Sequence, residues 1–418
     1  MFSVGQRVTL TIAAIAFGGD GVARTEEGPV VFVPFTAVGD VIVAEITEQR
    51  RNFYRAELRE LVEAGAGREE PRCPHFGNCG GCAYQHLDYA TELAAKRQQF
   101  IDTISRLGHF TDFPAPSPTV AAPQAYGYRN KMRLEPIRRL SNSGQSYVNY
   151  GYCQRDNQSY LIVKACPLAQ DCLNDLLPKA IGSAWGRQNA KRPKPYPLTL
   201  RVTSNGESQF YYGRAPANIP WLREVLAGEE FSVPLGSFWQ VNPPVAEELL
   251  RCVADWTKDS PARCLIDAYS GVGTFSIALG DRFQYRVLIE SDEQAIAAAT
   301  RNHELRQLKC RFQTGNTESQ LPTVLAHVKT RETLLILDPP RGGCQPKVMD
   351  TLRKFPVAEI VYVSCNPATL ARDLRLLCQD GLYAPIKSAL FDMFPRTAHF
   401  ESAVLLRHAS APQNFPKA

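Results

Sequence analysis

The sequence predicts an α/β protein in which a small N-terminal β-barrel precedes a doubly wound parallel sheet. From about residue 236, short apolar strands alternate with helical patterns, which is typical of a parallel sheet with helices on both faces. Before residue 61 the chain shows short strands separated by glycine turns, which is typical of a barrel of the OB type. At 418 residues the chain is too long for one compact core. We place the domains at residues 1–60, 61–235 and 236–410, the second being a mixed central region.

The composition excludes several classes of protein. No apolar run approaches the ~18 residues of a membrane span. The stretch TLTIAAIAF (9–17) resembles a secretory signal, but Val8, Leu10 and Ile12 alternate with Thr9 and Thr11 as in a strand. We therefore expect a cytoplasmic protein. The net charge of +5 permits an anionic partner without requiring one. The 12 cysteines, in a large chain without a signal, indicate a reducing compartment, where clustered cysteines more often bind metal.

The first 60 residues contain the strand patterns of the barrel: QRVTLTIAAIAF (6–17), GVARTEEGPVVFVPF (21–35) and DVIVAEITEQRRNFYRAEL (40–58). Barrels of this type commonly bind single-stranded nucleic acid. The alternative is a barrel that only packs against its neighbouring domain.

The central region begins with a cysteine-rich loop. Cys73, Cys79 and Cys82 follow the spacing C-x5-C-x2-C, and the glycines of GNCGGC (77–82) let the backbone wrap around a ligand. Three close thiolates and a distant fourth suit either zinc or an iron–sulfur cluster, and the spacing excludes neither.

The segment YGYRNKMRLEPIRR (126–139) follows in the same region. Its basic side chains are accompanied by tyrosines, a combination suited to phosphates and stacked bases of a single strand. The alternative is a solvated strand face. The residues concerned are Arg129, Lys131, Arg133, Arg138, Arg139, Tyr126 and Tyr128.

The strands of the parallel sheet end in polar residues, and ligands of such sheets bind at the carboxyl ends of the strands. The first, RCLIDAYSG (263–271), leads into a glycine turn that lacks the G-x-G-x-x-G spacing. Glu290 ends the second, 23 residues after Asp267, where a carboxylate can bind the ribose hydroxyls of an adenosine. Because no basic pyrophosphate site is evident and the strand ends are acidic, S-adenosylmethionine fits better than NAD.

The last two strands carry reactive groups. LDPPRGG (337–343) fixes Asp338 by two prolines, and the following Arg341 could hold a phosphate or an oxyanion. EIVYVSC (359–365) ends at the thiol of Cys365, which alone would be interpreted as a small apolar filler. Next to a methyl-donor site, however, a thiol can add to carbon 6 of uracil and so make carbon 5 nucleophilic. A base must then remove the proton from carbon 5. His399 and Glu401 are the candidates, and we choose Glu401, which precedes the strand pattern SAVLLR (402–407).

Five motifs in order, GSFWQVNP, DAYSGVGTF, LDPPRGG, VSCNPATLARDL and DMFPRTAHFE, resemble the RNA 5-methyluridine methyltransferases over nearly the whole chain. The resemblance implies a Rossmann-like S-adenosylmethionine methyltransferase domain and an N-terminal TRAM domain. It implies that Cys365 is the nucleophile and Glu401 the base. It implies the cofactor contacts Gln240, Tyr269, Glu290, Asn316 and Asp338. Ser270 and Thr274 depart from residues that many members have, which leaves any contact at 274 open.

The cysteine loop resembles the [4Fe-4S] site of the ribosomal-RNA branch of this family. That resemblance makes Cys166, in KACPLA (164–169), the fourth ligand after Cys73, Cys79 and Cys82, with Cys153 and Cys172 as competitors. The proposed methylation needs no electron, so we expect the cluster to be structural.

We therefore expect a monomeric uracil-C5 methyltransferase that acts on a flipped uridine. We expect its substrate to be 23S ribosomal RNA, with transfer RNA as the alternative. Three other classes are disfavoured. An iron–sulfur radical enzyme would carry a tight C-x3-C-x2-C triad. An inactive RNA-binding module would lack the chemical residues. A DNA cytosine-C5 methyltransferase would place its cysteine after proline.

Overall fold

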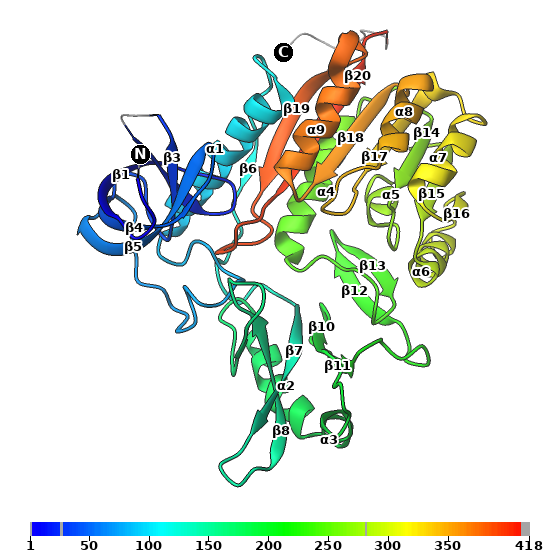
Figure 1. Ribbon diagram of the computed structural model, residues 1–418. Helices are drawn as coiled ribbons and strands as arrows, with labels where there is room; N and C mark the ends of the chain where they lie inside the picture. Colours follow the sequence, from blue (N-terminus) through cyan, green and yellow to red (C-terminus); the bar gives the residue numbers. More distant parts are fainter. Residues whose placement is uncertain (1, 26–27, 281, 411–418) are drawn as a thin grey trace.

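Residues 2–25, 28–280 and 282–410 are described by a computed structural model, shown in Figure 1. The described strands form a closed barrel, a five-stranded sheet, a two-stranded hairpin and an eight-stranded sheet. Every helix in the described ranges is too short or too polar to cross a bilayer.

The N-terminal domain is a closed five-stranded barrel in the order β1-β2-β3-β5-β4. Its strands alternate buried and exposed residues, because one face of each lines the barrel interior around Ile12, Val33 and Ile42. The predicted barrel is thereby confirmed. The strands are β1 (Arg7–Ile15), β2 (Asp20–Arg24), β3 (Val30–Pro34), β4 (Val41–Gln49) and β5 (Phe53–Glu63).

The central region contains a five-stranded antiparallel sheet in the order β11-β10-β7-β8-β9 and a separate β12-β13 hairpin. Helices α2 and α3 pack against this sheet. Their elements are β7 (Lys131–Leu140), β8 (Ser146–Cys153), β9 (Tyr160–Ile162), α2 (Asp171–Gly182), α3 (Ala184–Ala190), β10 (Leu198–Val202), β11 (Ser208–Tyr212), β12 (Leu222–Leu226) and β13 (Glu229–Val233).

The C-terminal domain is an eight-stranded sheet in the order β16-β15-β14-β17-β18-β20-β19-β6. The first five strands are parallel, and the centres of all but the edge strand β16 are apolar because both faces are covered. The predicted α/β fold is thereby confirmed. The strands are β6 (Thr119–Val120), β14 (Cys264–Ala268), β15 (Tyr285–Glu290), β16 (Arg311–Thr314), β17 (Thr333–Leu337), β18 (Glu359–Ser364), β19 (Tyr383–Phe391) and β20 (Glu401–His408).

Two layers of helices cover this sheet, as Figure 1 shows. Apolar residues of α4, α5 and α6 belong to one core, and those of α1, α7, α8 and α9 to the other. The helices are α1 (Tyr89–Gly108), α4 (Pro243–Thr257), α5 (Thr274–Ala278), α6 (Glu293–Glu304), α7 (Thr317–Leu325), α8 (Pro346–Lys354) and α9 (Pro367–Cys378), with short 3₁₀ turns at Thr330–Glu332 and Gln379–Gly381.

Two elements of the central region join the C-terminal sheet. Helix α1 packs against α9 and contributes Phe100 and Ile104 to its core, while β6 pairs with the edge strand β19. Because these contacts join residues almost 300 positions apart, the local sequence pattern does not reveal them. The helix that follows the cysteine loop is thus part of the wall of the C-terminal domain.

Candidate active site and cysteine site

A cavity of about 720 Å³ lies at the carboxyl ends of β14, β15, β17 and β18. This is the edge at which parallel sheets bind ligands. The structure brings together there every residue that the sequence assigns to catalysis or to the cofactor. They are Gln240, Tyr269, Glu290, Asn316, Asp338, Cys365 and Glu401.

The turn after β14 shapes one end of the cavity. Gly273 has φ +88°, and a Cβ there would lie 2.6 Å from the ring of His303, so both conformation and space require glycine. Tyr269 also has a positive φ, of 65°, which is a strained conformation for a residue with a side chain. The Gly271 N–H donates a 2.9 Å hydrogen bond to the Glu290 carboxylate. The glycine turn and the end of β15 are thereby joined.

Asn316 and Gln240 also line the cavity. Asn316 stands at the N-terminus of α7 without a side-chain cap bond, so its amide is free to face a ligand. Gln240 is fixed instead through its backbone, because Asn130 donates a 2.9 Å bond to its carbonyl. The central region thereby holds the loop that contributes to the cavity.

The opposite wall places a thiol beside a carboxylate. β18 and β20 are antiparallel, with Ser364 opposite Ser402. Cys365 directly follows Ser364 and Glu401 directly precedes Ser402, and both line the cavity. Asn366 fixes the backbone behind the thiol, because it caps α9 at the Ala368 N–H (3.1 Å) and donates to the Arg341 carbonyl (3.1 Å).

Negative charge is in excess in this wall. Burial, and then the charge of Asp338, raise the pKa of Glu401 well above its usual range, while Arg341 acts in the opposite direction. Burial also raises the pKa of Asp338. The pKa of Cys365 is raised to about 12 by burial and by the charges of Glu401 and Asp338, and Arg341 again lowers it. A cationic ligand in the cavity would lower all three pKa values.

His399 does not share this wall. It lines a separate hollow together with Asp20 of the barrel, Cys82 of the cysteine loop and Arg155. Burial, and then the charge of Arg341, lower the pKa of His399 to about 4, so its ring is neutral at pH 7. Of the two candidate bases, only Glu401 lines the cavity that contains Cys365.

Sequence reasoning missed two aromatic side chains of the cavity. Phe238 lies at its edge with 68% of its surface exposed, and Phe394 also lines it. The neighbouring Trp239 is buried. The motif GSFWQVNP contains Phe238 and Trp239 side by side, and no sequence pattern tells which of these two aromatic rings faces the cavity.

A second cavity, of about 250 Å³, is lined by cysteines. Its lining includes all four predicted ligands, Cys73, Cys79, Cys82 and Cys166, and also the competitor Cys153. The other competitor, Cys172, lies at the start of α2. Burial raises the pKa of each of the three loop thiols, and the charge of Cys166 raises it further in each case. Cys166 is therefore close to all three. In the described ranges, no set of three or more His, Cys, Asp or Glu side chains is arranged to hold a metal ion.

The basic segment 126–139 divides into two parts. Arg133, Arg138 and Arg139 are exposed on β7. Tyr128 is buried and donates a 3.0 Å hydrogen bond to the Pro395 carbonyl, so it is not available to stack on a base. Arg129 is half-buried and lines the cysteine cavity. The exposed arginines on β7 are the part of the segment that can contact phosphates.

Comparisons with known proteins agree with this geometry. Residues 324–409 match the tRNA (Uracil-5-)-methyltransferase family, and residues 2–58 match the TRAM domain. The chain is 33% identical to an uncharacterized RNA methyltransferase of Synechocystis sp., with 97% of each chain covered. The chain belongs to the RNA uracil-5-methyltransferase family. This methyltransferase is also 30% identical to an uncharacterized RNA methyltransferase of Protochlamydia amoebophila, over 97% of its own length and 99% of the relative's.

A solved structure matches the methyltransferase along its length. It is the Pyrococcus abyssi tRNA (uracil-54, C5)-methyltransferase in complex with S-adenosyl-L-homocysteine, with a TM-score of 0.68 and 25% identity, covering 95% of this chain and 99% of the other. The methyltransferase is therefore an S-adenosylmethionine-dependent enzyme that acts on RNA.

The charge balance around Cys365 predicts the reactivity of its thiol. Because the thiolate is the reactive form, alkylation by iodoacetamide should be slow at neutral pH and rise about tenfold per pH unit below the pKa. Arg341→Met removes a cation that lowers this pKa, so the variant should react several-fold more slowly at pH 8. Mass spectrometry of the peptide that contains Cys365 measures the rate. The control is Arg353→Met on α8, which breaks an ion pair with Asp380. An unchanged or faster rate in Arg341→Met would contradict this electrostatic account.

Proposed function

We propose that the methyltransferase converts uridine in RNA to 5-methyluridine, with Cys365 as the nucleophile and Glu401 as the base. The observation that carries this proposal is that Cys365, at the end of β18, and Glu401, at the start of β20, line the same cavity. A thiol that only filled the core would not need an acid beside it, because burying two acidic groups together is unfavourable.

The residues of the cavity suit S-adenosylmethionine. Buried acids in its wall fit a cationic sulfonium, and one Glu401 oxygen is buried without a hydrogen-bond partner among the described residues. Glu290 would hold the ribose hydroxyls, while Asp338, Asn316, Gln240 and Tyr269 would contact the remainder. When bound, S-adenosylmethionine supplies a methyl group on a positively charged sulfur.

The side chains of this enzyme would perform the reaction on the uracil ring. The Cys365 thiolate bonds to carbon 6, and the electron pair of the C5=C6 double bond moves to carbon 5 as part of an enolate. Carbon 5 would then use that pair to bond to the methyl group, while the bond from that methyl group to the donor sulfur breaks and the sulfur leaves with the electron pair as an uncharged thioether. Glu401 removes the proton from carbon 5, the C5=C6 double bond forms again, and the C6–S bond breaks to release Cys365 as a thiolate.

The buried position of Glu401 suits it to this role. A carboxylate whose pKa is raised is a stronger base than one in water. Arg341 lies close enough to influence both Glu401 and Cys365, and its charge would stabilise the enolate oxygen that forms on the ring.

We propose 23S ribosomal RNA as the substrate. The TRAM domain and the exposed arginines of β7 supply contacts to single-stranded RNA, and the cysteine loop resembles that of the ribosomal-RNA branch. The target uridine must leave its stack to enter the cavity. Transfer RNA is the second candidate, favoured by the likeness to the Pyrococcus abyssi tRNA methyltransferase. That the enzyme is a cytoplasmic monomer remains a prediction.

A gene deletion distinguishes the two RNA substrates. Ribosomal RNA from the deletion strain should lose 5-methyluridine at one or more positions, while transfer RNA keeps it. Sequencing-based mapping of both RNA classes measures this. Loss confined to transfer RNA would reverse the assignment, and a plasmid copy of the gene is the control for restoration.

Replacement of the base should separate methyl transfer from product release. In Glu401→Gln, Cys365 can still add to carbon 6 and the methyl group can still move, but no base removes the proton from carbon 5. The variant should accumulate an RNA–protein adduct that survives denaturing gels and carries the labelled methyl group. Cys365→Ala should bind RNA and form no adduct. Turnover by Cys365→Ala, or an adduct that persists in the double variant, would refute the assignment of the nucleophile.

We propose that Cys73, Cys79, Cys82 and Cys166 hold a [4Fe-4S] cluster. The four thiols line one cavity of about 250 Å³, and a cluster keeps its four cysteine sulfurs further apart than one zinc ion does. Cys166 is a stronger fourth candidate than Cys153, because its charge acts on all three loop thiols. Hydrogen bonds hold the site open, from Gln85 to the Cys82 sulfur (3.2 Å) and from the Cys166 N–H to Asn174 (2.8 Å).

Anaerobic purification tests this cluster. The protein should be brown and contain iron, and Cys166→Ser should bleach it, whereas Cys153→Ser and Cys172→Ser should not. Absorbance spectra and elemental analysis measure the outcome. Stoichiometric zinc without iron would exclude the cluster, and bleaching by Cys153→Ser alone would reassign the fourth ligand.

A further inference from the structure

The turn formed by residues 392–397 connects β19 to the segment that carries His399 and Glu401. It is short, and groups from distant parts of the chain bind its backbone carbonyls. Asn242 donates to the Met393 oxygen (3.4 Å), and Lys96 donates to the Phe394 oxygen (3.2 Å). The Tyr128 hydroxyl donates to the Pro395 oxygen (3.0 Å). The N–H groups of Ala83 (2.9 Å) and Tyr84 (3.2 Å) donate to the Arg396 oxygen.

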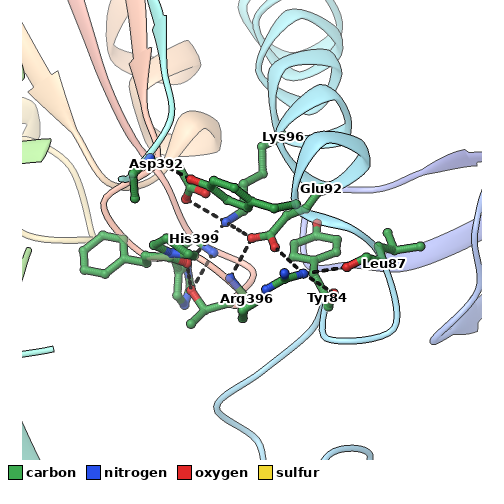
Figure 2. A network of polar contacts seen from close by, with 12 residues as sticks. Tyr84, Leu87, Glu92, Lys96, Asp392, Arg396 and His399 are labelled. Atoms are coloured by element: carbon green, nitrogen blue, oxygen red, sulfur yellow. Dashed lines mark hydrogen bonds and ion pairs between the residues drawn. The ribbon is translucent and has the colours of Figure 1, made fainter. Parts of the chain in front are cut away.

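A buried ionic network holds the start of this turn, and Figure 2 shows it between α1 and the turn. Lys96 has no exposed surface and donates to Glu92 (2.6 Å) and to Asp392 (2.8 Å). Glu92 and Lys96 both belong to α1, whereas Asp392 directly follows β19. Such a network tolerates little displacement, because a buried charge that loses its partner is strongly unfavourable.

Arg396 occupies the centre of the contacts between the turn and the cysteine loop. It has φ +67° and is 3% exposed, so a strained backbone is held by its surroundings. Its N–H donates to Glu92 (2.7 Å). Its guanidinium donates to the Leu87 carbonyl and pairs with Glu69 (3.0 Å) and Glu92 (3.5 Å), as Figure 2 shows in part.

The ion-pair partners of Arg396 and its hydrogen-bond partners among Tyr84, Leu87 and Glu92 come from residues 69–92, the stretch that contains the cysteine loop. Its guanidinium also lies over the ring of Tyr126, 4.9 Å from the ring centre. Ala83 and Tyr84, which bond to the Arg396 carbonyl, come directly after Cys82. Cys82 is in turn held by Gln85 at 3.2 Å. Any rearrangement of the loop around its cavity would therefore move the atoms that fix Arg396.

We propose that Arg396 is a positioning residue that sets the place of Glu401 according to the fold of the cysteine loop. The inference rests on the proposed roles of Cys365 and Glu401. Four residues separate Arg396 from Glu401, and one of them, Phe400, is completely buried, so a shift of the turn is passed on to the base. Cys365 is held independently by the cap of α9. Disturbing Arg396 therefore slows removal of the proton from carbon 5 more than it slows addition of the thiol.

Single-turnover kinetics test this positioning role. With RNA and labelled S-adenosylmethionine, Arg396→Lys and Arg396→Met should accumulate the methylated covalent adduct and release product at least about tenfold more slowly, since a displacement of ~1 Å can cost ~100-fold in rate. The rate of adduct formation should fall by less than about threefold. Loss of stability alone would slow neither step selectively. Arg407→Met, which breaks an ion pair with Glu359 at the other end of β20, is the matched control and should release product normally.

Two further variants keep the test decisive. Tyr128→Phe removes only the hydroxyl that binds the Pro395 carbonyl, so it should fold even where Arg396→Met does not, and should also slow release selectively. A double-mutant cycle of Cys82→Ser and Arg396→Lys should be non-additive in the release rate, because both act through the same contacts.

The outcomes separate this inference from the proposed function. If the adduct depends on Cys365 but release is unchanged in Arg396→Lys and Tyr128→Phe, the positioning role is wrong and the proposed function stands. An additive cycle would show that the cysteine loop does not act through Arg396. If Cys365→Ala still turns over, the proposed function itself is wrong.

Discussion

The active site depends on the burial of several acidic groups around one cavity. Burial raises the pKa of three groups in its wall, Cys365, Asp338 and Glu401. The charges of neighbouring acids raise the pKa of Cys365 and Glu401 further, whereas Arg341 lowers both. This arrangement is unfavourable for an empty cavity and favourable for one that contains a cation. A donor with a sulfonium group therefore matches the site electrostatically. Burial raises the pKa of both the Cys365 thiol and the Glu401 carboxyl, which disfavours the thiolate and increases the basicity of the carboxylate.

The rest of the protein fixes these acids in place. Parallel strands bring Asp338 and Cys365 to the same edge, and the antiparallel β20 returns the chain so that Glu401 reaches it from the opposite direction. Helix α1 then connects the cysteine loop to the catalytic edge through Lys96. The cysteine site, which is distant in sequence from Glu401, therefore contacts the turn that precedes this proposed base.

The sequence predicted much of this because the signals were local. A strand pattern that ends in VSCNP or LDPPR places its last residue at a sheet edge, so Cys365 and Asp338 could be assigned to one site before the structure was known. The barrel was predictable for the same reason. The spacing from Asp267 to Glu290 indicated an adenosine site without revealing that the Glu290 carboxylate also accepts a hydrogen bond from Gly271.

The features that the sequence did not reveal depend on contacts between distant segments. The charges of Lys96 and Asp392 are typical of surface residues, and nothing local shows that they are buried together across almost 300 positions. Tyr128 lies among basic residues and was expected to face RNA, but its hydroxyl is needed by the Pro395 carbonyl. The positive φ of Arg396 likewise has no sequence signature, because arginine rarely adopts it.

Covalent trapping by 5-fluorouridine tests directly whether Cys365 is the nucleophile. The wild-type enzyme is incubated with S-adenosylmethionine and RNA that contains 5-fluorouridine, and the covalent product is digested and located by tandem mass spectrometry. Fluorine cannot leave carbon 5 as a cation, so elimination stalls after methyl transfer. The account predicts a methylated 5-fluorouridine attached through carbon 6 to the peptide that contains Cys365. Attachment to another cysteine, or methylation of uridine without any covalent intermediate, would contradict it.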